Sequence, residues 1–313
     1  MNSPVRTVAS WRLRTRTVEL GSRTLIMGVV NITPDSFSDG GLFLDPQAAV
    51  AHALRLLQEG ADLLDLGAES TRPGSNVGSR AGGLPGSPLA PAVSSEEEQA
   101  RLLPVLEGIL HAHPGAIVSV DTYKAATARA ALAAGAEIVN DVSGFAWDPE
   151  MASICGGLTP GLVLMHTRGR PEDWRTQPQL APDELLASVR AGLEHSLVVA
   201  AQAGLPLESI VLDPGYGFGK RFGENYTLLA RQADLLSMGR PLLAGVSRKS
   251  FLGHTLAPLF ADQDAPPEAR DTASLAAMVA AILRGASIVR VHVVRPAVEA
   301  ARIADAVLAA DNS

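Results

Sequence analysis

The chain has little of two residues that often indicate a function. Its 313 residues contain one cysteine, Cys155, so no disulfide can form within the chain and the sequence fits a reducing compartment. Because Cys155 lies in an apolar, glycine-rich stretch, we interpret it as a structural thiol. Lysine is also scarce: Lys124, Lys220 and Lys249 stand among cations that are otherwise arginines. An ammonium and a planar guanidinium bind different groups, so each lysine marks a position where arginine would not serve.

The sequence also lacks long apolar runs and an excess of positive charge. No segment reaches the length of a membrane span. The net charge of −7 gives no general attraction for nucleic acid or membrane surfaces, so we expect neither as a partner and expect a cytoplasmic protein. Hydrophobic residues make up 47% and charged residues 19%, which is typical of a globular chain. An anionic substrate would therefore need locally clustered cations.

Eight short apolar runs each stop at polar residues. The runs are rich in Val, Ile and Leu and lack clean alternation, as expected of parallel strands covered on both faces. The polar residues that end them are, in chain order, Asn31, Glu69, Asp121, Asn140–Asp141, His166, Asp213, Ser247–Arg248–Lys249 and His292.

Helix signals fill the gaps between these runs. Asp45 and Pro46 are a helix N-cap and first-turn proline, and Ser95 with Glu98 forms a capping box. Pro182 and Pro296 would open two further helices. Strand–helix alternation repeated eight times predicts an α/β fold with one (β/α)8 TIM barrel, treated as a single domain over residues 1–313. The alternative is a doubly wound sheet, but no GxGxxG follows the first strand.

Residues 1–23 form an extension before the first of these strands. The alternation over residues 15–26 around Gly21–Ser22 predicts an N-terminal β-hairpin that plugs the floor of the barrel. The arginine-rich start also resembles a transit peptide, and we favour the hairpin.

Polar groups at different strand ends would project into one pocket, because catalytic groups of such barrels lie at the carboxyl ends of the strands. Asp121, Asn140 and Asp213 suit a flat heterocycle with many N–H donors, such as an amino-oxo pyrimidine ring. The alternative is that the two aspartates only cap the helices that follow.

Three candidate anion-binding residues end the last two strands, where many barrels hold phosphate. Arg290 interrupts an apolar strand, where an unpaired charge is costly, and alternation puts it on the same face as His292. Lys249 ends the strand before. A core histidine is the alternative for His292 alone.

Two loops add further candidates. Residues 67–75 (GAESTRPGS) are stiff and contain Arg72, which could hold a carboxylate or could be an ordinary surface arginine. In DPGYGFGK, Phe218 is read as a ring that packs on a planar ligand. The histidines have no metal-binding spacing, so any metal would be Mg²⁺ held by oxygen ligands and phosphate.

In series, the motifs resemble those of the dihydropteroate synthase family. GVVNITPDSFSDGG, DLGAESTRPGS, VDTYK, NDVSG, MHTRGRP, DPGYGFGK, GVSRKS and RVH occur in the family's order over residues 25–309. The resemblance implies a (β/α)8 barrel that condenses 7,8-dihydropterin-6-ylmethyl diphosphate with p-aminobenzoate, giving 7,8-dihydropteroate and diphosphate in folate biosynthesis. It also implies a homodimer that sulfonamides would inhibit.

The resemblance assigns roles by position in three groups. The residues that would hold the pterin are Asp121, Asn140, Met165, Asp213 and Lys249, with Phe218 nearby. Asn31, Arg290 and His292 would hold the diphosphate, with Asn31 also a Mg²⁺ ligand. Thr71, Arg72, Pro73 and Ser247 would line the p-aminobenzoate site, and Asp35 would face the reacting centre. Carboxylates near a cationic methylene favour an SN1-like path in which Asp35, Asp121, Lys249 and Arg290 are catalytic.

The chain departs from the family pattern at three places. Tyr123 and Val293 replace a smaller residue and an aspartate, and residues 76–93 form a longer insertion that we expect to be flexible. Two other functions remain open. A methyltetrahydrofolate–corrinoid methyltransferase would not combine the STRPG and SRKS loops, and a non-catalytic pterin-binding paralogue should lose Arg72 or a diphosphate ligand.

Overall fold

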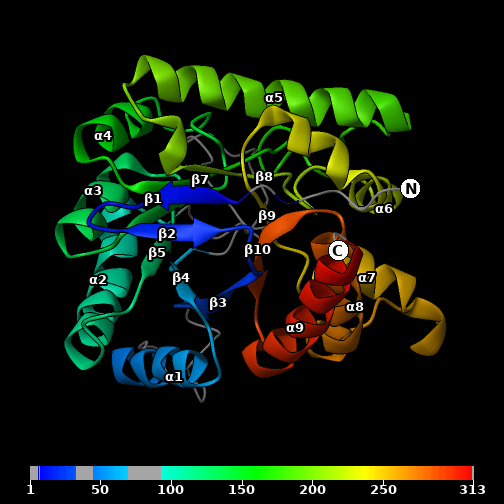
Figure 1. The fold of residues 1–313 in the computed structure, drawn as a ribbon, viewed down its shortest axis with the longest axis horizontal. Coiled ribbons are helices and arrows are strands. Elements are labelled where there is room, and N and C mark those ends of the chain that lie inside the picture. Colours follow the sequence, from blue (N-terminus) through cyan, green and yellow to red (C-terminus); the bar gives the residue numbers. More distant parts are fainter. Residues whose placement is uncertain (1–5, 7, 33–44, 70–92, 312–313) are drawn as a thin grey trace, which may run out of the picture.

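Eight parallel strands close into a barrel in this computed structural model, which describes residues 6, 8–32, 45–69 and 93–311 (Figure 1). Each strand pairs with the next along the chain, and β10 closes the barrel on β3. This confirms the predicted (β/α)8 fold over the doubly wound alternative. The strands are β3 (Leu25–Asn31), β4 (Leu63–Gly67), β5 (Val118–Asp121), β6 (Ile138–Asp141), β7 (Gly161–Met165), β8 (Ile210–Asp213), β9 (Leu242–Ala244) and β10 (Ala286–Val291).

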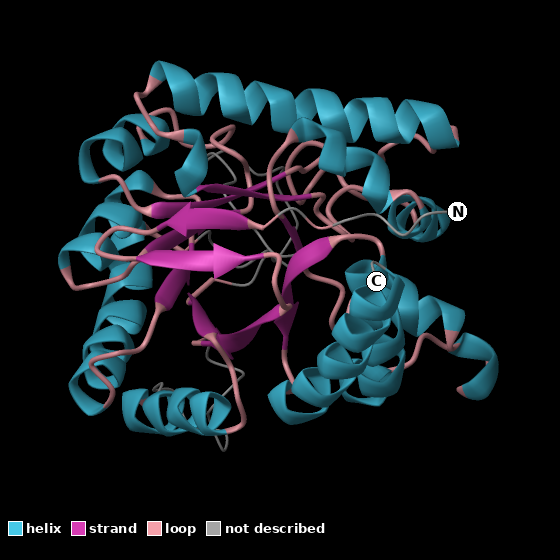
Figure 2. Cartoon of the chain, viewed as in Figure 1, coloured by secondary structure: helices cyan, strands magenta, loops and turns pink. Residues whose placement is uncertain are grey.

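Helices surround this barrel (Figure 2). They are α1 (Pro46–Gln58), α2 (Ser95–Ala112), α3 (Ala125–Ala133), α4 (Met151–Leu158), α5 (Pro182–Gln202), α6 (Phe222–Ala230), α7 (Ser250–Thr255), α8 (Asp271–Leu283) and α9 (Val294–Asp311). Their apolar faces pack on the outward-facing Val, Leu and Ile side chains of the strands in one large core. None of the described helices is long and apolar enough to cross a membrane.

The predicted helix starts are correct for α1 and α5 and wrong by one or two residues for α2 and α9. Asp45 caps α1 by accepting from the backbone N–H of Gln47. The cap of α2 is Ser94, not Ser95, and Glu98 turns inward to accept from Thr127 instead of closing a capping box. Helix α9 begins at Val294, so its proline lies in the first turn and not at the start.

An N-terminal hairpin covers one end of the barrel, as predicted, but its turn lies earlier than expected. Strands β1 (Ala9–Arg12) and β2 (Thr17–Leu20) pair antiparallel, so the turn lies between them and not at Gly21–Ser22. The reason is that residues from Leu25 onward pair with β10 and β4 inside the barrel and are not available to β2. Figure 1 shows the hairpin in front of the barrel strands.

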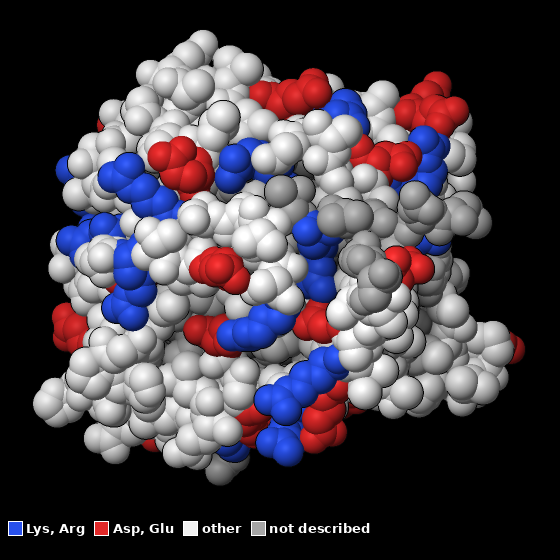
Figure 3. Space-filling model, in the orientation of Figure 1, with Lys and Arg blue, Asp and Glu red and all other residues white. Residues whose placement is uncertain are grey.

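The hairpin closes the floor of the barrel with large apolar side chains. Trp11, Leu13 and Leu20 are buried against the inward-facing side chains of the strands. Trp11 also donates from Nε1 to the carbonyl of Ser209 at 2.8 Å, which satisfies its one polar group. On the hairpin face, acidic and basic side chains are interspersed (Figure 3).

The interior changes from apolar to polar along the strands. Inward-facing residues in the floor layer are apolar, for example Leu63, Ile138, Val211 and Ile288. Two residues further along the same strands stand Asp65, Asn140, Asp213 and Arg290. Because side chains alternate along a strand, each of these polar residues points the same way as the apolar residue before it. A polar layer therefore lies directly above the apolar floor.

Cys155 is buried on the inner side of α4. Burial raises the pKa of its thiol to about 12. The thiolate needed for reactivity is absent at neutral pH, which agrees with a structural role.

Candidate active site

The polar layer and the strand ends above it bring most of the predicted site residues to one end of the barrel, called the rim below. Register places Asn31, Gly67, Asp121 and Asn140 beside one another across four neighbouring strands. A Cβ added at Gly67 would lie 3.6 Å from the Cβ of Asp121, an ordinary contact distance, so Gly67 borders the Asp121 side chain directly. Met165 pairs in the same manner with Asp213 across β7 and β8.

Arg290 lies between two carboxylates. Its Nε donates to Asp65 Oδ2 at 2.5 Å and its Nη2 donates to Asp121 Oδ2 at 2.8 Å. Asn140 Nδ2 donates to the same Asp65 oxygen at 3.1 Å. The four side chains form one hydrogen-bonded network, and the interpretation of Asp121 as a helix cap is wrong.

Asp65 was not predicted as a site residue. It stands in the apolar run LLDLG of β4 and is fully buried. The signal that could have found it is the one that singled out Arg290: a charge inside an apolar strand needs an opposite charge nearby.

Burial controls the ionisation of the two predicted pterin carboxylates. It raises the pKa of Asp121 to about 7, although the guanidinium of Arg290 opposes the rise. Burial also raises the pKa of Asp213, against the backbone N–H of Gly215, which donates to Asp213 Oδ1 at 2.7 Å. Both carboxyls interact with the same two cations, Arg290 and Lys249, and clustered carboxyls with perturbed pKa values are typical of a functional site.

Lys249 and Phe218 face each other at the rim. The Lys249 ammonium lies 3.9 Å from the centroid of the Phe218 ring, and Phe218 packs edge-on against Trp174 at 5.0 Å. Burial lowers the pKa of Lys249 to about 8, with Arg290 adding to the effect. Phe218, Met165, Trp174 and Tyr123 belong to one apolar cluster beside the polar layer.

Lys220 holds the loop that follows β8 in place through hydrogen bonds to backbone carbonyls. Its Nζ donates to the carbonyls of Gly215 at 2.7 Å, Phe218 at 3.2 Å and His166 at 3.3 Å. Three acceptors around one nitrogen suit an ammonium and not a planar guanidinium. This buried lysine joins the loops after β7 and β8 and fixes the backbone that presents Phe218.

The residues after β9 and β10 meet at the same end of the barrel. Ser247 Oγ lies 3.0 Å from His292 Nδ1, and both side chains are half-buried, so His292 is not a core histidine. Arg248 adopts a left-handed φ of 57° and pairs with Asp271 at 2.7 Å. That pair anchors the backbone that carries Ser247 and Lys249.

Tyr123, one of the three departures from the family pattern, adds an aromatic side chain at the rim. Tyr123 packs edge-on against Trp147, with ring centroids 5.2 Å apart. The guanidinium of Arg170 lies over the Trp147 ring, 5.4 Å from its centroid. A larger side chain here is therefore used in packing and does not simply fill the pocket.

Several predicted residues lie outside the described residues. They are Asp35, Thr71, Arg72 and Pro73, together with residues 76–92 of the insertion.

No group of three or more His, Cys, Asp or Glu side chains in the described ranges could hold a metal ion. Asn31, the predicted ligand, is half-buried at the end of β3 and offers one amide oxygen. A single amide oxygen could hold Mg²⁺ only if water and substrate phosphates supplied the other ligands, which is a common arrangement for this ion.

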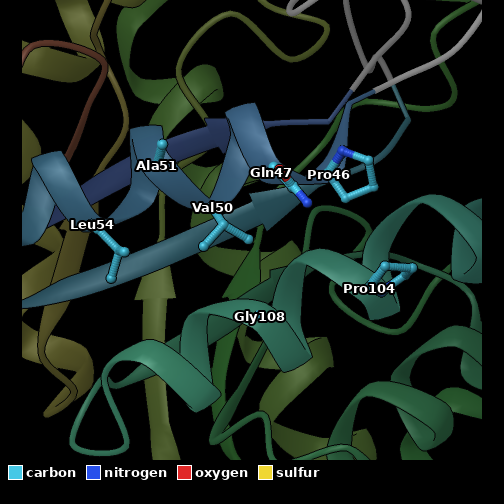
Figure 4. Close-up of a pocket in the computed structure, with 7 residues that line it drawn as sticks. All are labelled: Pro46, Gln47, Val50, Ala51, Leu54, Pro104 and Gly108. Atoms are coloured by element: carbon cyan, nitrogen blue, oxygen red, sulfur yellow. The ribbon is translucent and has the colours of Figure 1, made fainter.

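Two cavities lie outside the polar layer. One of about 300 Å³ lies between α1 and α2, where Val50 and Leu54 face Pro104 and Gly108 (Figure 4). The other, of about 310 Å³, is lined by Ser247, Asp271, Met278 and Val293 beside the rim. Val293, where the family pattern has an aspartate, contributes an apolar side chain to the mixed polar and apolar wall of the second cavity.

Comparison with known proteins identifies similar proteins over most of the chain. Residues 27–292 match the family model described as pterin binding enzyme. The dihydropteroate synthase of Mycobacterium leprae is 42% identical over 284 residues, covering 90% of this chain and 92% of the relative.

Solved structures agree with this match. The Xanthomonas albilineans dihydropteroate synthase with 4-aminobenzoic acid superposes with a TM-score of 0.82 at 40% identity, covering 97% of this chain and 99% of that one. The same protein in complex with 7,8-dihydropteroate gives 0.79 at 37% identity, covering 96% and 99%. A Yersinia pestis dihydropteroate synthase with a sulfonamide drug complex gives 0.82 at 36% identity, covering 96% and 99%. The chain belongs to the pterin-binding enzyme family and, within it, to the dihydropteroate synthases.

Proposed function

We propose that the rim described above is where this chain condenses 7,8-dihydropterin-6-ylmethyl diphosphate with p-aminobenzoate. The observation that carries the proposal is the Asp65–Arg290–Asp121–Asn140 network beside Asp213 and Lys249. The network brings hydrogen-bond acceptors close to the cations Arg290 and Lys249 at one end of the barrel.

The pterin would lie above the polar layer. Asp121, Asn140 and Asp213 offer oxygen acceptors to the N–H donors of an amino-oxo pyrimidine ring. Phe218 and Met165 would pack on its flat face, and Lys249 would donate to its ring oxygen or nitrogen.

The diphosphate would lie toward Arg290 and His292, with Asn31 at its edge. Bound there through Asn31 and the phosphates, Mg²⁺ would neutralise the charge that develops on the leaving group. Arg290 and His292 would donate hydrogen bonds to the same oxygens.

The p-aminobenzoate would lie on the outer side of the pterin. Ser247 comes from the described part of the chain, held 3.0 Å from His292. Thr71, Arg72 and Pro73 come from the loop after β4, and the guanidinium of Arg72 would bind the carboxylate in bidentate fashion.

The condensation would follow an SN1-like path. The methylene–oxygen bond breaks and its electron pair leaves with diphosphate. The cationic methylene is delocalised into the pterin, and Asp35 and Asp121 favour it electrostatically. The amine of p-aminobenzoate then forms the new carbon–nitrogen bond and releases a proton to solvent. A kinetic isotope effect at the methylene carbon that indicates strong participation of the nucleophile would contradict this path.

A turnover assay tests the function itself. Purified protein with both substrates and Mg²⁺ should release diphosphate and form 7,8-dihydropteroate. Binding of the pterin diphosphate without release would indicate a non-catalytic paralogue. Methyl transfer from methyltetrahydrofolate to a corrinoid would indicate the methyltransferase.

Three further properties complete the proposal. Sulfonamides should compete with p-aminobenzoate, because they present a similar aromatic amine. The chain should work in the cytoplasm, where its one thiol stays reduced. It should form a homodimer, which light scattering would detect as twice the chain mass of 32.6 kDa.

A further inference from the structure

A fully buried carboxylate under the proposed pterin site contacts no substrate in the reaction described above. Asp65 lies in the middle of β4, with apolar neighbours on both sides in the sequence. One of its oxygens, Oδ2, accepts from both Arg290 Nε at 2.5 Å and Asn140 Nδ2 at 3.1 Å. The other, Oδ1, is buried and has no hydrogen-bond partner among the described residues.

Stability alone does not explain this arrangement. A buried ion pair recovers little more than the cost of removing its charges from water, and well-packed apolar residues often replace such a pair without loss. An unsatisfied buried oxygen adds a further cost. The floor layer immediately below is apolar and well packed, so an apolar residue at position 65 would continue a pattern that the barrel already uses.

The contacts of Asp65 instead set the orientation of two predicted substrate ligands. Asn140 turns its amide nitrogen toward Asp65, and its carbonyl oxygen therefore points away from Asp65. Arg290 gives its Nε to Asp65, which fixes the plane of the guanidinium and brings Nη2 to Asp121.

We propose that Asp65 is a positioning residue for the pterin diphosphate: it fixes the amide orientation of Asn140 and the plane of the Arg290 guanidinium. This inference deepens the proposed function and depends on it. With Asp65 in place, Asn140 presents an acceptor to the N–H donors of the pterin. Without Asp65, the Asn140 amide can rotate and offer a donor to the pterin instead. Arg290 then keeps only its hydrogen bond to Asp121 and can turn about it.

The test replaces Asp65 by its neutral isostere and compares the steady-state kinetics of the folded enzyme. Asp65→Asn should raise the KM for the pterin diphosphate by about ten-fold or more, since one misplaced charged hydrogen bond costs on the order of one such factor. The KM for p-aminobenzoate should change by less than about three-fold, because the hydrogen bonds of Asp65 go to ligands of the pterin and the diphosphate.

Asp62→Asn is the matched control. Asp62 lies just before β4, at the opposite end of the barrel from the rim, and pairs with Arg23 at 2.6 Å. The substitution makes the same chemical change in the same region of the chain. It should alter thermal stability without changing either KM.

A pH profile separates positioning from a general loss of structure. The charged groups that act on Asp121 are Arg290, Asp65, Glu98 and Lys249. Removing the Asp65 charge removes a repulsion that opposes ionisation of Asp121, so the acid limb of kcat/KM should move to lower pH in Asp65→Asn. It should stay in place in Asp62→Asn.

A swap variant covers the case in which Asp65→Asn does not fold. In Asp65→Asn/Asn140→Asp the hydrogen bond is reversed, because residue 65 now donates to residue 140, while one carboxylate and one amide are kept. Under the proposal, the swap variant folds and has a pterin KM closer to that of the wild type than either single variant.

The outcomes distinguish this inference from the proposed function. If the wild-type enzyme does not form dihydropteroate, the proposed function fails. If the wild type is active and Asp65→Asn keeps its pterin KM and its acid limb, the positioning role is wrong. A swap variant that remains unfolded, or that is no better than the single variants, also overturns it.

Discussion

The ammonium of Lys249 lies 3.9 Å from the centre of the Phe218 ring, so a cation and an aromatic face come together at the rim. The two residues come from different loops, after β9 and after β8. The contact keeps the ammonium beside Asp213 and Asp121, which favour its charged form, while burial and Arg290 oppose it. The ring and the ammonium are therefore presented to a ligand as one preformed unit.

Removing the Lys249 ammonium should weaken pterin binding. Lys249→Ala should raise the KM for pterin diphosphate by about ten-fold or more, since a hydrogen bond from a charged donor is worth roughly 1.5–3 kcal/mol. The KM for p-aminobenzoate should change much less. Steady-state kinetics with each substrate varied in turn measures both. The exposed Arg295, replaced by alanine, is the control for losing a positive charge. Equal kinetics in the two variants would contradict the assignment of Lys249.

The pH dependence of kcat/KM for the pterin diphosphate should be bell-shaped. Asp121, with a pKa raised to about 7, must lose its proton for one oxygen to accept from Arg290 and the other from the pterin, so the rate falls below that pH. Lys249, with a pKa lowered to about 8, must keep its proton, so the rate falls above that pH. Lys249→Arg should remove the alkaline limb, because a guanidinium stays charged. An unchanged alkaline limb in Lys249→Arg would assign that limb to the substrate or to another group.

Arg72→Ala should raise the KM for p-aminobenzoate by about ten-fold or more while the KM for pterin diphosphate stays within about two-fold. The reason is that a bidentate bond to the carboxylate of p-aminobenzoate would be lost. Inhibition by a sulfonamide that lacks a carboxylate should weaken less than p-aminobenzoate binding. Equal changes in the KM of both substrates would place Arg72 elsewhere.

Lys220 should act on the pterin site through the backbone. Lys220→Met removes the donor that holds the carbonyls of Gly215, Phe218 and His166, so Phe218 loses its fixed position. We expect a rise of about ten-fold in the KM for pterin diphosphate and a lower Tm. Lys220→Arg should not restore the wild-type KM, because a planar fork cannot reach three carbonyls around one point. Full rescue by arginine would show that only the charge matters.

The hairpin should matter for stability and not for substrate binding. Trp11→Ala removes a side chain that is 1% exposed from the floor of the barrel and should lower the free energy of unfolding by about 3–5 kcal/mol. Chemical denaturation measures the loss, and Arg12→Ala, exposed on the same strand, should cost little. Since the hairpin covers the end opposite the rim, a change in either KM at a temperature where Trp11→Ala is folded would contradict this separation.

Much of the fold could be predicted from the sequence, because the patterns that indicate strands and helix starts lie within a few neighbouring residues. Each strand is a short apolar run that stops at a polar residue, and Asp45 with Pro46 marks a helix start within two residues. The hairpin was predicted, but its turn was misplaced, because the same alternation fits pairing on either side of β2. A hairpin of β2 with β3 around Gly21–Ser22 is excluded only by the tertiary structure, in which β3 pairs in parallel with β10.

The site was predictable in its parts and not in its connections. Asp121, Asn140, Asp213, Lys249 and Arg290 could be found at strand ends, and the barrel brings them together as expected. Asp65 stands out in the sequence as a charge inside an apolar strand, but its pairing with Arg290 could not be predicted, because the two residues are 225 positions apart along the chain. The hydrogen-bond acceptors of Lys220 could not be predicted either, because they are backbone carbonyls, which every residue has.

The sequence by itself determined the order of strands and helices and the polar groups that each strand delivers to the rim, because apolar runs and caps act over a few residues. Only the tertiary structure decided which charges meet, how the Asn140 amide is turned, and how far burial moves the pKa of Asp121. These depend on distances of a few ångströms between residues remote in the chain, and closure of the barrel is what sets those distances.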